Sequence, residues 1–278
     1  MKKLYTLLAL TISFSMNAQI STNNTSNSGQ DASAIGVNTT ASGTISTVMG
    51  ADTTASGTLS TAIGAGSNAS GNISTAMGFY TTASGDNSTA MGFYTTASDY
   101  GSLVIGQYNS SGSSVTDNAD NFSTSNTAFV IGNGAYSSNK SDAFKVMFNG
   151  DATIGNDLTV SGDVVVSSDA RLKSNIVSLG STLSRLLLID GKSYTMKKDG
   201  KQKIGVLAQD IREVFPELVT EDDNEMLAVN YQGLVPVLIN ALKEQNDKIA
   251  NQQSEIDVLK EQEKRLERLE AIISKMDK

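Results

Sequence analysis

The sequence predicts a mainly β protein that ends in an α-helical segment, and three patterns carry this prediction. Glycine recurs every 14 residues through the first half of the chain. Short alternating apolar segments separated by glycine follow it. Apolar residues in a 4-3 spacing then run to the C-terminus. Because each pattern has its own period, the chain changes structural class along its length.

The repeat is the strongest of these patterns. Single apolar residues precede glycines at positions 36, 50, 64, 78, 92 and 106, and Ala-Ser-Gly triplets begin at 41, 55, 69 and 83. The fifth triplet, at 97–99, has Asp in place of Gly. Gly and Thr disfavour a helix, so each repeat is expected to form two short strands and two tight turns. A disordered Gly/Ser linker is the alternative, but a linker needs no register.

We expect the repeat to assemble from several chains. One apolar residue per half-repeat, such as Ile35 or Met49, is too little to fill the core of a single chain. The motif, a small residue with Ser-Gly and then Ser-x-Ala-Ile/Met-Gly, resembles the head domain of trimeric autotransporter adhesins over residues 30–110. The resemblance implies a left-handed parallel β-roll made by three chains.

Aromatic pairs occur one repeat apart, at Phe79-Tyr80 and Phe93-Tyr94. A stacked ladder of these rings would provide a contact patch for a glycan or a protein. The alternative is that they are surface residues of the strands without a ligand.

Residues 111–167 predict a polar loop followed by a narrow β-stalk. Alternating apolar pieces such as Leu158/Val160 and Val164/Val166 are separated by glycines at 150, 155 and 162. Alternation between glycines is typical of short strands.

Residues 168–235 predict a small α+β domain. Helices are expected near 183–187 and over 208–215, the second ended by Pro216. Strands are expected at 194–196 and 203–207, joined by the turn Asp199-Gly200, and two more strands flank the polar segment 221–225.

Residues 236–278 predict a coiled coil whose helix starts near Asn230 as its N-cap. Polar residues fall on its seam at Gln245 and Gln252, and the spacing shifts near 260–263 as in a stammer. The seam positions before that shift are Leu238, Leu242, Gln245, Ile249, Gln252, Ile256 and Leu259.

Four segments of this region resemble the intramolecular chaperone domain at the C-terminus of phage endosialidases and other tail fibres. They are SDARLKSNI at 168–176, IGVLAQD at 204–210, VFPELV at 214–219 and VNYQGLVPVL at 229–238. The resemblance implies a trimerising chaperone that assists a β-rich fibre and then releases itself by autoproteolysis. It also implies a serine–lysine dyad at Ser168 and Lys173.

The residues themselves permit this chemistry. The chain has no His and no Cys, which excludes Ser-His-Asp and Cys-His catalysis and the common zinc sites. A serine nucleophile then needs a lysine as its base. A lysine must be neutral to accept a proton, so its pKa must fall from about 10.4 through burial or a nearby cation. Arg171 would favour that change and Asp169 would oppose it.

The cut is expected beside Ser168, at the bond to Ser167 or at the bond to Asp169, and the sequence does not choose between them. An N-to-O acyl shift would cut the first of these bonds. The alternative role for Ser168 is that of a turn or cap residue.

Residues 1–18 predict a signal peptide, with Lys2 and Lys3 before an apolar run that ends near Ala18. No other apolar run is long enough to span a bilayer. The net charge of −8, without a basic patch in the repeat, argues against nucleic acid and anionic membranes as partners. We expect no cofactor and no bound metal.

These observations predict a secreted or cell-surface homotrimer, an adhesin-like fibre that contacts a host surface, a glycan or a matrix ligand. Its enzymatic activity would be one self-cleavage per chain by a serine peptidase dyad, with no outside substrate. The alternative is an uncleaved fibre that keeps its C-terminal module as a trimerisation foot. An enzyme acting on glycans is disfavoured, because the repeat half lacks a clustered carboxylate pair.

Overall fold

The computed structural model describes residues 23–222 and 225–276, and the chain separates into two compact units, residues 1–164 and 165–278. The predicted signal peptide, residues 1–18, lies outside the described residues. In the part of the chain that is described, none of the helices combines the length and the apolar character needed to cross a bilayer.

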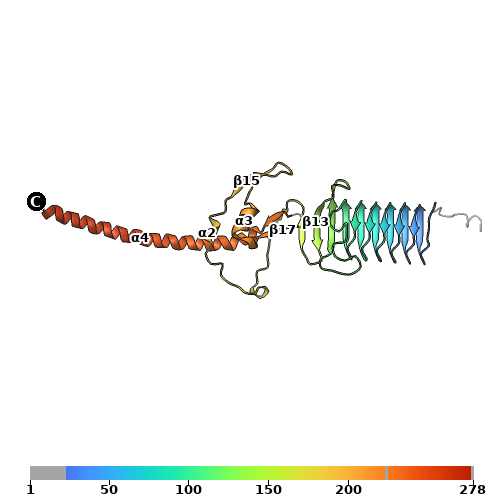
Figure 1. The fold of residues 1–278 in the computed structure, drawn as a ribbon, viewed down its shortest axis with the longest axis horizontal. Helices are drawn as coiled ribbons and strands as arrows, with labels where there is room; N and C mark the ends of the chain where they lie inside the picture. Colours follow the sequence, from blue (N-terminus) through green and yellow to red (C-terminus); the bar gives the residue numbers. More distant parts are fainter. Residues whose placement is uncertain (1–22, 223–224, 277–278) are drawn as a thin grey trace, which may run out of the picture. The chain divides into compact units, whose positions relative to one another are not determined.

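Unit 1 begins with a solenoid in which each repeat makes one coil, as Figure 1 shows from blue to green. Five-residue and two-residue strands alternate along the chain, which confirms the two strands predicted per repeat. Both kinds stack in parallel, and the pairing of Gly36 with Gly50 and of Gly50 with Gly64 follows the period of the sequence. The longer strands are β1 (Ser33–Val37), β3 (Thr47–Ala51), β5 (Thr61–Ala65), β7 (Thr75–Phe79), β9 (Thr89–Phe93) and β11 (Leu103–Gln107). The shorter strands are β2 (Thr40–Ala41), β4 (Thr54–Ala55), β6 (Asn68–Ala69), β8 (Thr82–Ala83) and β10 (Thr96–Ala97).

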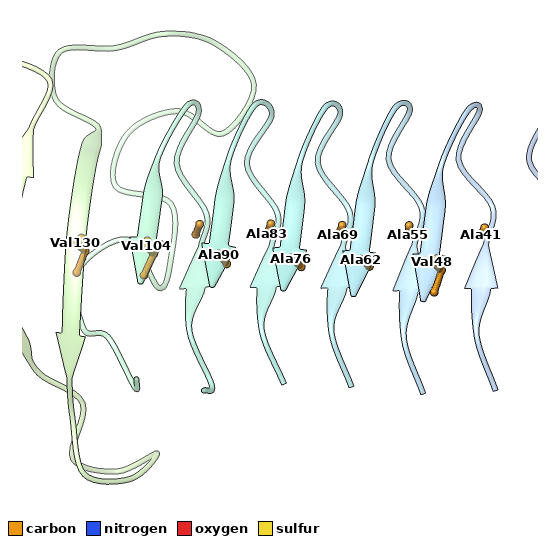
Figure 2. Packing of buried hydrophobic residues seen from close by; sticks show 11 residues of the cluster. Ala41, Val48, Ala55, Ala62, Ala69, Ala76, Ala83, Ala90, Val104 and Val130 are labelled. Atoms are coloured by element: carbon orange, nitrogen blue, oxygen red, sulfur yellow. The ribbon is translucent and has the colours of Figure 1, made fainter. Parts of the chain in front are cut away.

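The core of the solenoid consists of small side chains from the two sheets. Figure 2 shows Ala69 of a short strand and Ala62 and Ala76 of the long strands among them, and all three are fully buried. The hydroxyls of Ser60 and Ser74 are also buried and donate to glycine carbonyl oxygens at 2.6 Å. Our expectation that a single chain cannot fill a core is therefore wrong, because Ala and Ser suffice in a coil this narrow.

The apolar residue before each repeat glycine lies instead on the outer face of the longer sheet. Met49, Met77 and Met91 are 46%, 37% and 39% exposed, while the residue before each is fully buried. Side chains of a strand alternate between its two faces, so this column points away from the coil. In the single chain the Met residues of this column are exposed, and Ile35, Ile63 and Ile105 are half-buried.

The glycine after each of these residues is required by the stacking of coils. Gly64 has a φ of 122°, and a Cβ added to it would lie 1.9 Å from the carbonyl oxygen of Gly78. Side chains of L-residues are strained at such a φ, and the next coil leaves no room for one. The same contact recurs between Gly50 and Gly64 at 1.8 Å.

The aromatic residues of the repeats stack into a ladder along one corner. The rings of Tyr80 and Tyr94 lie 5.0 Å apart, those of Tyr94 and Tyr108 lie 4.9 Å apart, and both pairs are within 10° of parallel. Phe79 and Phe93 stack beside them at 5.2 Å. Because the rings cover one another's faces, the ladder offers ring edges to a partner rather than the faces on which a sugar would stack.

Three further strands complete unit 1. β12 (Thr127–Asn133) pairs in parallel with β11, and β13 (Asp142–Met147) and β14 (Ala152–Ile154) continue the sheet in antiparallel order. Asp99, where earlier repeats have Gly, is buried and accepts hydrogen bonds from the backbone N–H groups of Thr116 and Thr127 at 2.6 and 2.8 Å. Its carboxylate thereby anchors the loop that precedes β12.

The predicted strands at Leu158/Val160 and Val164/Val166 are absent. Between Ile154 and Lys192, all of which the structure describes, no residue lies in a strand. Leu158 and Val164 are 66% and 63% exposed. A strand needs a hydrogen-bonding neighbour for its backbone, and a single chain supplies none here.

Unit 2 contains the predicted helices and hairpins around a small core. β15 (Lys192–Thr195) pairs antiparallel with β16 (Gln202–Gly205), and β17 (Val219–Glu221) with β18 (Leu227–Val229). Ile211, Phe215 and Val237 are buried at its centre. The remaining elements are the 3₁₀ turn η1 (Ala170–Leu172), α2 (Leu183–Leu186), α3 (Ala208–Val214), η2 (Pro216–Leu218), η3 (Tyr231–Gly233) and α4 (Leu234–Met276).

Helix α4 is the predicted long helix. Asn230 caps the turn that leads into it, and its side chain accepts a hydrogen bond from the N–H of Gly233 at 3.1 Å. The predicted seam of α4 is exposed in the single chain, with Leu242 72% and Ile249 55% accessible. The coiled coil itself stays a prediction.

Candidate functional site

One short turn brings Ser168 and Lys173 together. Asp169 caps η1, and its carboxylate accepts a hydrogen bond from the N–H of Arg171 at 2.8 Å. The N–H groups of Leu172 and Lys173 then donate to the carbonyl oxygens of Asp169 and Ala170 at 3.1 and 3.0 Å. Because the backbone closes on itself, the side chain of Lys173 folds back over Ser168.

The amine of Lys173 reaches two atoms of Ser168. Its Nζ donates to the hydroxyl Oγ at 2.8 Å and to the carbonyl oxygen at 3.1 Å. The first distance is within the range in which a base takes a proton from a nucleophile. Ser167 and Asp169 flank the pair, and all four residues are exposed in the single chain.

Arg171 contacts Asp169 through two guanidinium nitrogens, Nε and Nη2. Its Nη2 lies 2.7 Å from Asp169 Oδ2, and its Nε lies 3.1 Å from both carboxylate oxygens. The hydrogen bonds from Arg171 hold the pKa of the Asp169 carboxyl below its usual range. The guanidinium of Arg171 and the carboxylate of Asp169, the two charges beside Lys173, are thus paired with each other.

Sequence reasoning missed a second polar cluster, which ties α2 to α4. The carboxylate of Glu244 accepts hydrogen bonds from the Ser181 hydroxyl at 2.6 Å, from the N–H of Leu183 at 3.2 Å and from the N–H of Thr182. Ser-Thr before a helix is a cap signal, but its partner lies on another helix. These bonds, with that of Ser181 the largest, lower the pKa of Glu244 to about 2.

Glu244→Gln is expected to flatten the acid dependence of this unit's stability. The ordinary pKa of 4.5 exceeds the folded value of about 2, so the carboxylate stabilises the fold fully above pH 4.5 and progressively less down to pH 2. The protection factors against hydrogen exchange at the amides of residues 181–183, which correct for the intrinsic pH dependence of exchange, should fall steeply as the wild type is acidified across this range and change little in the variant. An equal fall of the protection factors in both proteins would contradict the assignment.

Unit 2 also carries an open apolar groove of about 730 Å³ between its two hairpins. Tyr194, Leu207, Met226 and Tyr231 line it, with Lys197 at its edge. Among residues 23–222 and 225–276, no three carboxylates gather in a way that could hold a metal ion.

Comparison with protein families gives two matches. Residues 28–53, 55–81 and 83–109 match the YadA head domain repeat, and residues 168–220 match the chaperone of endosialidase. The comparison with curated proteins gave no match. The first match covers the coils of the solenoid, and the second begins at Ser168.

The two families imply a homotrimer, and together they support a trimeric adhesin or fibre with an intramolecular chaperone. The head repeats suggest a surface or secreted protein. The chain therefore carries three segments that match the YadA head domain repeat and, after them, a segment that matches the chaperone of endosialidase.

Proposed function

We propose that this chain is an exported homotrimeric surface fibre whose C-terminal module drives trimer folding and then cuts itself free beside Ser168. The observation that carries the proposal is the 2.8 Å contact between Lys173 Nζ and Ser168 Oγ. This contact lies at the first residue of the segment that matches the chaperone family. A cut there separates the fibre from the module that folds it.

Three apolar rows that remain exposed or half-buried in the single chain support the trimer. The first is the Ile/Met column on the outer face of the solenoid, the second is the Leu158–Val166 segment, and the third is the seam of α4. Exposed apolar surface of this extent marks an interaction site. Three chains side by side would bury the rows and supply the strand neighbours that residues 158–166 lack.

The proposed reaction starts when neutral Lys173 takes the proton of the Ser168 hydroxyl. At the Ser167–Ser168 bond, Oγ attacks the Ser167 carbonyl carbon through a five-membered ring. Lys173 then returns the proton to the departing amide nitrogen, which leaves an ester that water hydrolyses to a carboxylate and the free hydroxyl. At the Ser168–Asp169 bond, attack by the same Oγ would need a four-membered ring. That cut therefore requires a water molecule or the Ser168 of a neighbouring chain.

Assembly would control this reaction. Ser168 and Lys173 are exposed in the single chain, where water favours the charged form of an amine. Covering the junction with two further chains removes that water and disfavours the charged form. Cleavage then follows trimer formation.

The alternative is an uncleaved fibre in which the module remains as a trimerisation foot. The exposure of Ser168 and Lys173 favours this alternative, because a solvated lysine is a poor base.

Export rests on the N-terminal sequence and on the head repeats. The expected ligand of the head is a host-surface, glycan or matrix molecule. Tyr80 and Tyr94 are exposed for it, and Tyr108 beside them is half-buried.

Met77→Glu tests the trimer. The substitution places a charge in the middle of the Ile/Met column, and burying three such charges together is costly. We expect the purified chain to lose its trimeric mass in light scattering after size exclusion. Ser56→Glu, at an exposed position directly after β4, is the control that should keep the trimer. A trimeric Met77→Glu protein would rule out this face as the interface.

A further inference from the structure

We propose that Arg171 is a positioning residue for self-cleavage. By binding both carboxylate oxygens of Asp169, it keeps the Lys173 amine in contact with the Ser168 hydroxyl. The inference rests on the proposed self-cleavage and extends it from the two reacting residues to the pair that sets their geometry.

Local hydrogen bonds must stabilise the conformation of η1, because none of its residues is buried in the single chain. Every residue from Asp151 to Ser181 is exposed in the single chain, and Leu172, inside the turn, is 73% exposed. The backbone is extended on both sides of η1, with φ and ψ of −62° and 133° at Asp169 and of −125° and 147° at Lys173. The placement of Lys173 therefore depends on the hydrogen bonds of η1 and of its cap.

Asp169 is the cap, and Arg171 occupies both of its carboxylate oxygens. Oδ1 accepts from the backbone N–H of Arg171 at 2.8 Å and from its Nε at 3.1 Å, while Oδ2 accepts from Nη2 at 2.7 Å. A guanidinium in this two-point geometry fixes the orientation of the carboxylate. The carboxylate in turn fixes the first peptide of the turn.

The pairing also prevents a competing contact. Without Arg171, the Asp169 carboxylate would be the nearest anion to the Lys173 amine in sequence. An ion pair with it would draw Lys173 away from Ser168 and would stabilise the charged form, which cannot act as a base. Arg171 thus leaves the Lys173 amine free to contact the Ser168 hydroxyl.

Because Arg171 also keeps the Asp169 carboxylate away from Lys173, removing that carboxylate should rescue the loss of Arg171. A purely structural role for Arg171 would predict no such rescue. Cleavage is followed by denaturing mass spectrometry after the full chain is refolded. Arg171→Met should slow cleavage about five-fold, the upper range for an exposed ion pair. Arg171→Lys should give an intermediate rate, because lysine neutralises Asp169 but lacks the two-point geometry. Asp169→Asn combined with Arg171→Met should recover the rate, because Asn still caps the turn but no longer attracts Lys173.

Lys201→Met is the matched control. Lys201 contacts Asp199 in the same way, with its N–H 3.1 Å from Oδ1 and its Nζ 3.2 Å from Oδ2. Its removal should leave the cleavage rate unchanged, and all variants should give equal trimer yields. A wild type that cleaves no faster than Arg171→Met, or a double variant that stays as slow as Arg171→Met, overturns the positioning role. A wild type that never cleaves overturns the proposed self-cleavage and this role with it.

Discussion

Ser168→Ala is expected to leave the chain in one piece under conditions in which the wild type yields two fragments. The substitution removes the only atom of Ser168 that can attack a carbonyl carbon, while the backbone of the turn keeps its cap at Asp169. Lys173→Met should have the same effect, because it removes the base 2.8 Å from that atom. Ser174→Ala, one residue beyond the lysine, should cleave like the wild type.

Denaturing mass spectrometry of the refolded chains reads this result directly. The mass of the N-terminal fragment also identifies the bond, since the fragment ends at Ser167 or at Ser168. A Ser168→Ala chain that still divides at this place would assign the cut to another nucleophile or to an external protease.

Gly64→Ala is expected to destabilise the head by about 3 kcal/mol or more, a large effect for one methyl group. The backbone of Gly64 has a φ of 122°, and the added Cβ would lie 1.9 Å from the carbonyl oxygen of Gly78. Conformational strain contributes about 1–2 kcal/mol of the loss, and separating two stacked coils contributes the rest. Urea unfolding followed by circular dichroism, at one chain concentration, measures the difference.

Gly191→Ala is the matched control for this experiment. Gly191 has no heavy atom within 4 Å of an added Cβ, so the midpoint of unfolding of the head should hardly move. Equal midpoints for the Gly64 and Gly191 variants would contradict the close stacking of the coils.

Much of the fold could be predicted from the sequence, because the repeat and the turns are local. The 14-residue period of glycine appears unchanged as the register of the strands. The hairpin around Asp199-Gly200 and the helix before Pro216 also follow from nearby residues. The core of the solenoid was misjudged because residues such as Ala62 and Ala76 are not conspicuously apolar. Only the width of the coil shows that they fill it.

The strands predicted beyond Ile154 show a different limit. Alternation at Leu158/Val160 indicates which side chains prefer burial, but a strand forms only where a neighbour pairs with it. In the single chain no strand pairs with residues 158–166.

The site was predictable in part. The proximity of Ser168 and Lys173 follows from their separation of five residues. The partner of Arg171 depends on the geometry of one turn. The sequence led us to expect that the charge of Arg171 acts on Lys173, whereas Arg171 pairs with Asp169. Glu244 was missed because it lies 62 residues from Thr182.

The central claim is that three chains fold together and then lose their C-terminal modules. Native mass spectrometry of the folded wild-type protein tests it most directly. We expect an assembly of three chains, each ending at Ser167 or Ser168, with the C-terminal fragments separate from it. A single chain of any length, or a stable assembly of three intact chains, would contradict the account.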